Sequence, residues 1–178
     1  MALLAFALYA THDVLIRILG ETYSVFQIMF YMGLFSFPFL VMMLIRDPEP
    51  GTLRAVHPWW SLTRTICVVL SAGGAFYAFT VLPLAQVYSV LFASPLLITL
   101  LSIPMLGEKV GLHRGVAVVV GLLGVIVVLR PGGTELGLGH AAALLSASTA
   151  ALNGVIVRKI GPDERPAVLL LYPMLANV

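Results

Sequence analysis

The feature that most constrains this chain is a run of 43 residues, 65–107, that contains no Asp, Glu, Lys or Arg. A single helix over this run would be about twice as long as a crossing of the apolar bilayer core requires. The run therefore predicts two membrane-spanning helices. We place the break at Leu82-Pro83-Leu84, because proline removes a backbone donor and disfavours helical geometry in the residue before it.

Hydropathy predicts six complete membrane helices and the start of a seventh in the 178 residues. The expected ranges are 1–19, 25–45, 65–81, 85–106, 112–129 and 138–160, and the seventh begins at Ala167 and is cut short at Val178. With 60% hydrophobic and 10% charged residues, the composition is not that of a soluble domain. The predicted fold class is all-α, a polytopic transmembrane helical bundle.

Basic residues gather in alternate connecting segments. Those after the second, fourth and sixth predicted helices hold Arg46, Arg54, Lys109, Arg114, Arg158, Lys159 and Arg165, whereas the others hold Arg17 and Arg130. Because basic residues near helix ends are retained in the cytoplasm, we expect an integral membrane protein with a cytoplasmic N-terminus. The expected location is a bacterial inner membrane. Trp59 and Trp60 fit an aromatic anchor at the membrane surface. A net charge of +2 without a basic run predicts no nucleic-acid partner.

The chain repeats itself with a shift of 141 residues. Nine of the 36 aligned positions are identical, among them Arg17 with Arg158 and Gly20 with Gly161. Five helices separate the two copies, an odd number, so the second copy enters the membrane from the opposite face. Inverted repeats of this kind are typical of secondary transporters. We therefore divide the chain into a first five-helix repeat, 1–133, and the start of a second inverted repeat, 134–178.

Small residues at a spacing of four predict close approach between helices. In the sixth predicted helix they form two faces, one with Ala143, Ala147 and Ala151 and the other with Ser146, Ala150 and Gly154. Gly111 and Gly115 suggest a third such contact at the start of the fifth helix. The segment 71–75, Ser-Ala-Gly-Gly-Ala, predicts either a tight crossing or a bend.

Four segments combine into a family pattern. They are Pro95-Leu96-Leu97, the turn Leu106-Gly107-Glu108-Lys109-Val110, the apolar stretch 121–129 and the opening of the second repeat at 137–158. Together they resemble the EamA family of the drug/metabolite transporter superfamily. The resemblance implies ten helices in two inverted five-helix repeats and transport of small metabolites such as amino acids, nucleotide derivatives or vitamins. It also implies that this chain is a fragment of such a carrier.

Two adjacent ionisable residues, His12 and Asp13, lie inside the first predicted helix. A charged group within a membrane costs at least about 2.5–3.5 kcal/mol on insertion scales, so its presence indicates a functional site. Asp13 could bind a cationic group of a substrate or carry a coupling proton, and a histidine side chain exchanges protons near neutral pH. The alternative is that Asp13 and Arg17, four residues apart on one helix face, neutralise each other.

Uncharged polar residues complete the predicted substrate-binding set. Gln27 and Tyr31 share a face of the second helix, Tyr77 lies in the third, and Asn153 in the sixth is the repeat counterpart of His12. We expect a midplane cavity lined by the first, second, third, fourth and sixth helices. For each residue the alternative is an interhelical hydrogen bond or an interfacial position.

Five further polar residues are interpreted as additional cavity candidates or as structural groups. Gln86, Tyr88 and Ser94 of the fourth predicted helix are additional candidates for the cavity. Arg64, at the cytoplasmic mouth of the third helix, could attract an anion, but we interpret it as a topology charge that extends to the lipid headgroups. Glu108 is interpreted as structural, accepting hydrogen bonds at the start of the fifth helix.

These observations predict a secondary active transporter that moves a small polar or amphipathic metabolite by alternating access. The alternatives are a proton-coupled multidrug exporter and a structural or regulatory membrane protein. The chain is not expected to be an enzyme, since no G-x-S-x-G, H-E-x-x-H, Walker or dinucleotide motif occurs. No cofactor and no metal site are predicted. The expected partners are a small-molecule substrate and the lipid bilayer, with proton coupling and a homodimer left open.

Overall fold

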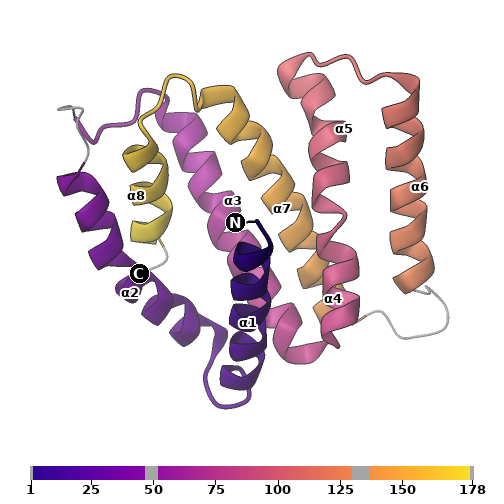
Figure 1. The fold of residues 1–178 in the computed structure, drawn as a ribbon, viewed down its shortest axis with the longest axis horizontal. Helices are drawn as coiled ribbons and strands as arrows, with labels where there is room; N and C mark the ends of the chain where they lie inside the picture. The colour runs from indigo at the N-terminus through magenta and orange to yellow at the C-terminus, as the bar shows by residue number, and fades with distance from the viewer. Residues whose placement is uncertain (1, 47–51, 130–136, 177–178) are drawn as a thin grey trace.

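The computed structural model describes residues 2–46, 52–129 and 137–176, and within these ranges the chain forms helices and no strands (Figure 1). The helices are α1 (Ala2–Leu19), α2 (Val25–Ile45), α3 (Pro58–Val81), α4 (Leu84–Leu91), α5 (Ser94–Leu106), α6 (Leu112–Leu129), α7 (Leu138–Ile160) and α8 (Pro166–Ala176). The all-α prediction is confirmed. The proposed repeat boundary at 133–134 and the residue Arg130 lie outside the described ranges.

Five stretches of the described chain are long and apolar enough to cross a membrane: α2, α3, the combined α4–α5 segment Leu84–Leu106, α6 and α7. The sequence predicts a sixth span at 1–19. Helix α1 does form there, but it is not among the five. Helix α8, with 11 residues, is a shorter apolar helix, in agreement with the predicted start of a seventh.

Two helix boundaries differ from the prediction. Helix α3 begins at Pro58 instead of Thr65, because proline is well suited to the first position of a helix, where no backbone N–H is required. The fourth predicted helix, 85–106, is divided at Phe92 and Ala93 into α4 and α5. The reason is Pro95, whose ring would clash with the carbonyl four residues earlier if one continuous helix ran through it.

With α4 and α5 taken as one segment, successive helices run in alternate directions, so the C-terminal ends of α2, α5 and α7 lie at one end of the bundle and those of α1 and α3 at the other (Figure 1). Helix α7 runs opposite to α1 and lies between α3 and the α4–α5 pair, packing against all three. Helix α8 packs on α2 and α3, and α6 lies at the edge of the bundle against α4 and α5. The buried core joins α1, α2, α3, α4 and α7 through Ile16, Ile28, Ala78, Phe79, Val87, Val90, Ala143 and Ala147.

The contact between α3 and α7 is close because both helices present small residues. A Cβ atom added at Gly74 would lie 2.7 Å from the carbonyl oxygen of Ala142. Ser146 Oγ donates a hydrogen bond to the Ser71 carbonyl at 2.7 Å, and Ser71 Oγ donates one to the Ser146 carbonyl at 3.2 Å. The segment 71–75 is therefore a tight crossing.

The other small-residue predictions have different outcomes. Ala143, Ala147 and Ala151 are fully buried, as their spacing predicts. The prediction for Gly111 and Gly115 is wrong, because a Cβ atom at either glycine would meet no described atom within 4 Å. Helix α6 lies at the edge of the bundle, where small residues have no neighbour to approach.

Candidate substrate cavity

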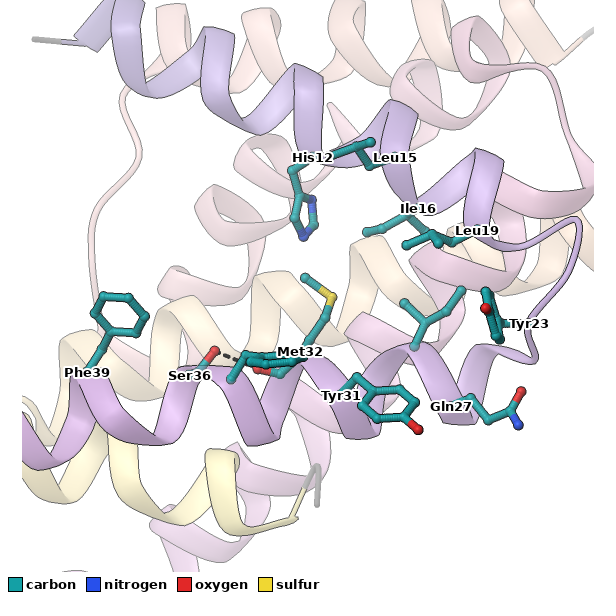
Figure 2. Close-up of a pocket in the computed structure, with 12 residues that line it drawn as sticks. His12, Leu15, Ile16, Leu19, Tyr23, Gln27, Tyr31, Met32, Ser36 and Phe39 are labelled. Atoms are coloured by element: carbon teal, nitrogen blue, oxygen red, sulfur yellow. Dashed lines mark hydrogen bonds between the residues drawn. The ribbon is translucent and has the colours of Figure 1, made fainter.

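A cavity of about 610 Å³ lies between α1 and α2 (Figure 2). Its lining is mainly apolar and aromatic, and consists of His12, Leu15, Ile16, Leu19, Tyr23, Gln27, Ile28, Tyr31, Met32, Phe35, Ser36 and Phe39. The volume and the small number of polar groups are typical of small-molecule sites. In Figure 2 His12 points from α1 toward Met32 on α2. Three residues of the predicted set, His12, Gln27 and Tyr31, thus meet in one cavity.

Asp13 lies beside this cavity and binds groups from two helices. Its Oδ2 accepts a hydrogen bond from the Tyr88 hydroxyl of α4 at 2.6 Å, and its Oδ1 lies 3.0 Å from His12 Nδ1. The Asp13 side chain keeps only 16% of its surface exposed. His12 in the cavity wall is therefore connected through Asp13 to α4.

Arg17 does not neutralise Asp13 in the structure. Among the described residues the contacts of the Asp13 carboxylate are those to Tyr88 and His12, and the Arg17 side chain is exposed. Instead of an ion pair with Arg17 on its own helix, Asp13 forms a hydrogen bond with Tyr88, which lies 75 positions away in α4.

Aromatic rings hold the groups around Asp13 in place. The Tyr88 ring lies 5.9 Å from the ring of Phe79 and 6.1 Å from that of Phe92, measured between centroids. The His12 ring lies 6.2 Å from Phe76 of α3. Tyr88 is only a secondary candidate from the sequence, since no local pattern indicates that it meets Asp13.

Gln27 has a second role at the start of α2. Its Oε1 accepts a hydrogen bond from the backbone N–H of Ser24 at 3.0 Å, and its own N–H donates to Ser24 Oγ at 3.3 Å. This reciprocal pair is a capping box, which satisfies two backbone donors at a helix start. The Ser-x-x-Gln spacing of residues 24–27 is the sequence signal for that role.

Tyr77 and Asn153 do not reach the cavity between α1 and α2. Tyr77 lines a separate cavity of about 720 Å³ beside α2 and α3. Asn153 lies in α7, and its Oδ1 is buried and has no hydrogen-bond partner among the described residues. The expected lining by five helices is therefore not observed, because close packing of α7 on α3 and α5 removes α7 from the cavity wall.

Arg64 and Glu108 form contacts between helices, and the sequence predicts neither contact. Arg64 is buried, and its Nη1 donates a hydrogen bond to the carbonyl oxygen of Leu169 in α8. Its interpretation as an exposed topology charge is wrong, because α3 begins earlier than predicted and places this residue inside the helix. Glu108, after α5, forms an ion pair with Arg158 at the end of α7. In the described ranges no three His, Cys, Asp or Glu side chains gather as a metal site requires.

The apolar helices and the cavity define an integral membrane protein with a site of small-molecule size. The chain belongs to the EamA-like transporter family, which matches residues 1–130. The resemblance seen in the sequence is confirmed, and members of this family are transporters and not enzymes.

Named relatives come from several bacteria. A riboflavin transporter of Rhizobium johnstonii is 27% identical over 139 residues, which cover 78% of this chain and 44% of the relative. An S-adenosylmethionine uptake transporter of Rickettsia prowazekii is 25% identical over 170 residues, covering 96% and 58%. A riboflavin transporter of Vibrio cholerae is 28% identical over 139 residues, covering 78% and 45%. The chain thus spans about half the length of these relatives, and no solved structure gives a significant match.

Proposed function

We propose that the chain is part of a secondary active transporter that moves a small polar or amphipathic metabolite across the membrane by alternating access. The observation that carries this proposal is the cavity between α1 and α2, with His12 in its wall and Asp13 directly behind. An apolar and aromatic lining with a few polar groups suits an amphipathic ligand. Riboflavin and S-adenosylmethionine, named for the relatives, are the first substrates to test.

Asp13 is the proposed coupling residue. An ionisable group within a membrane helix is costly unless it has a function or a partner, and the partners of this carboxylate are His12 on its own helix and Tyr88 on α4. A proton or a cationic group of the substrate would compete with Tyr88 for Asp13. Such competition would change the contact between α1 and α4 and so link occupancy of the site to helix movement.

The exposure of α1 supports the inverted repeat. Val155 and Ile156 of α7 are fully buried, whereas their repeat counterparts Val14 and Leu15 of α1 are 44% and 53% exposed. The buried face of α7 packs mainly on α3. In an inverted two-repeat carrier the counterpart of α3 would cover α1 in the same way. We therefore propose residues 1–133 as one repeat and 134–178 as the start of the next, in a fragment of a ten-helix carrier.

The membrane setting is proposed from the same features. The connections after α2, α5 and α7, which carry most of the basic residues, lie at one end of the bundle (Figure 1). The positive-inside rule assigns this end to the cytoplasm. The proposed location is a bacterial inner membrane with the N-terminus inside.

The second candidate function is proton-coupled export of diverse cationic drugs. A single carboxylate in the first helix, as Asp13 is, suits this activity, because it can bind a proton or a cation in turn. Competition by unrelated organic cations would favour this candidate, whereas selective competition by analogues of one metabolite would favour the metabolite carrier.

The test is uptake into liposomes that contain the complete protein, with riboflavin, S-adenosylmethionine and a metabolite mixture offered in turn. Asp13→Asn should abolish coupled uptake, because the neutral amide cannot exchange a proton. Glu21→Gln is the matched control, since Glu21 is an exposed carboxylate just beyond α1, and it should transport normally. Unchanged uptake by Asp13→Asn at every pH would reject the role of Asp13, and wild-type uptake equal to that of empty liposomes would reject transport.

A further inference from the structure

A further cavity, lined by both polar and apolar residues, lies at the start of α3, at the opposite end of that helix from its connection to α4. It has a volume of about 470 Å³ and is bounded by residues 54–65 and by Tyr172 of α8. We propose that this cavity binds the phosphate headgroup of an anionic membrane lipid. The proposal does not depend on the transported substrate.

Arg54 supplies the positive charge. Its guanidinium makes no hydrogen bond or ion pair with any other described residue, although it lines the cavity. The neighbouring backbone is fixed, since the Tyr172 hydroxyl donates to the Leu53 carbonyl at 3.3 Å and accepts from the Ala55 N–H at 3.4 Å. The backbone on both sides of Arg54 is therefore fixed beside the cavity, and the exposed guanidinium is available to an anion.

The nearby acidic residues have other partners. Glu164 Oε1 accepts a hydrogen bond of 2.7 Å from the backbone N–H of His57, and Asp163 Oδ2 lies 3.3 Å from His57 Nε2. Neither carboxylate pairs with Arg54. Among the described residues Arg54 therefore has no counter-ion, and its charge is available to an external anion.

Ser61 offers an unused hydrogen-bonding group in the cavity lining. The residue is 5% exposed, and its Oγ is buried with no hydrogen-bond partner among the described atoms. Its carbonyl accepts the Thr65 hydroxyl at 2.8 Å, so only the side-chain group is unpaired. Buried hydroxyls in proteins normally find a partner, since leaving one unpaired is costly. A phosphate oxygen bound at Arg54 would supply an acceptor in this cavity.

The surroundings favour a lipid as the source of the phosphate. Trp59 and Trp60 at the first turn of α3 are residues typical of the membrane surface, which places the cavity at headgroup level. Leu62 lines the cavity and begins an exposed apolar row that continues through Ile66 and Leu70. This row would accommodate an acyl chain below the headgroup. Basic pockets between membrane helices are known binding places for anionic headgroups.

Native mass spectrometry of the complete protein tests the proposal, with titration of phosphatidylglycerol and, separately, of phosphatidylcholine. We expect one phosphatidylglycerol to bind more tightly than phosphatidylcholine. Arg54→Ala should weaken this binding about fivefold, the effect of one basic residue near an anionic surface. Ser61→Ala should weaken it about threefold, as loss of one hydrogen bond in a membrane protein does.

Arg46→Ala is the matched control, because it removes an exposed positive charge at the end of α2 that does not line this cavity. Its phosphatidylglycerol binding should equal that of the wild type. Equal losses for Arg46→Ala and Arg54→Ala, or no preference for phosphatidylglycerol, would overturn the proposal. Inorganic phosphate added alone forms the last arm: if it binds and displaces phosphatidylglycerol, the site is one for soluble phosphate and not for a lipid.

Discussion

At the residue scale, the hydroxyl of Tyr88 is the group that joins α4 to the Asp13 carboxylate. A hydrogen bond to a charged group is stronger than one between neutral groups, and a membrane interior gives the carboxylate few other partners. Two aromatic neighbours of Tyr88, the tilted ring of Phe79 and the stacked ring of Phe92, hold its ring independently of the hydroxyl. Removing the hydroxyl should therefore weaken the Asp13 contact and leave the packing intact.

Tyr88→Phe is expected to lower the free energy of unfolding by about 1 kcal/mol, because one interhelical hydrogen bond is lost. Chemical denaturation in detergent, followed by circular dichroism, measures this change. Tyr9→Phe is the matched control, since Tyr9 is an exposed residue of α1 that makes no hydrogen bond in the described structure. If the Tyr88→Phe and Tyr9→Phe proteins had equal free energies of unfolding, the Tyr88 hydroxyl would contribute nothing to stability.

The sequence identifies part of this site. An aspartate within an apolar segment is recognisable from the sequence alone, so Asp13 and its neighbour His12 can be identified without a structure. Tyr88 cannot be identified as the partner, because it lies 75 positions from Asp13 and the chain between them passes through two other helices, α2 and α3, whose packing decides the contact. Asn153 was selected by its repeat position, and the close packing of α7 separates it from the cavity.

At the element scale, the crossing of α3 and α7 depends on the absence of a side chain at Gly74. Ser71, one turn before Gly74, and Ser146, which lies against Gly74 from α7, donate hydrogen bonds to each other's carbonyl groups. Close backbone approach and these hydrogen bonds are the forces that associate helices in a membrane, where apolar burial gives no driving force. Any added atom at Gly74 must therefore push α7 away.

Gly74→Ala is expected to destabilise the protein by about 1–3 kcal/mol, the range found for overpacked interiors. Gly115→Ala makes the same change within α6, where the added methyl group meets open space, and should be neutral or slightly stabilising. Thermal unfolding of both variants in the same detergent compares them. Equal melting temperatures would contradict the α3–α7 geometry.

Hydropathy predicts most helices well, and its two failures have identifiable causes. The start of α3 was placed late because the polar stretch around Arg64 interrupts the apolar signal. The break between α4 and α5 was missed because a proline inside an apolar run can either kink a helix or begin a new one. Composition does not decide between these outcomes, since both occur in membrane helices.

At the scale of the whole molecule, α1 and α7 are related in sequence but have different surroundings. Helix α7 is enclosed by α3, α4 and α5, whereas α1 leaves much of its apolar surface exposed beside the cavity. The sequence could indicate this relation, through the 141-residue shift, but not the position of the cavity. Hydropathy predicts which segments cross a membrane, and does not predict which of them become neighbours.

We propose that this chain is one repeat and the start of a second in a two-repeat carrier. The intact mass of the protein, purified from the membrane in which its own gene is expressed, tests this proposal. We predict a mass well above the 19.1 kDa of this chain, large enough for the remaining helices of the second repeat. A mature product of 19.1 kDa would contradict the claim, because the helices needed to cover α1 and complete the inverted pair would then be absent from the protein.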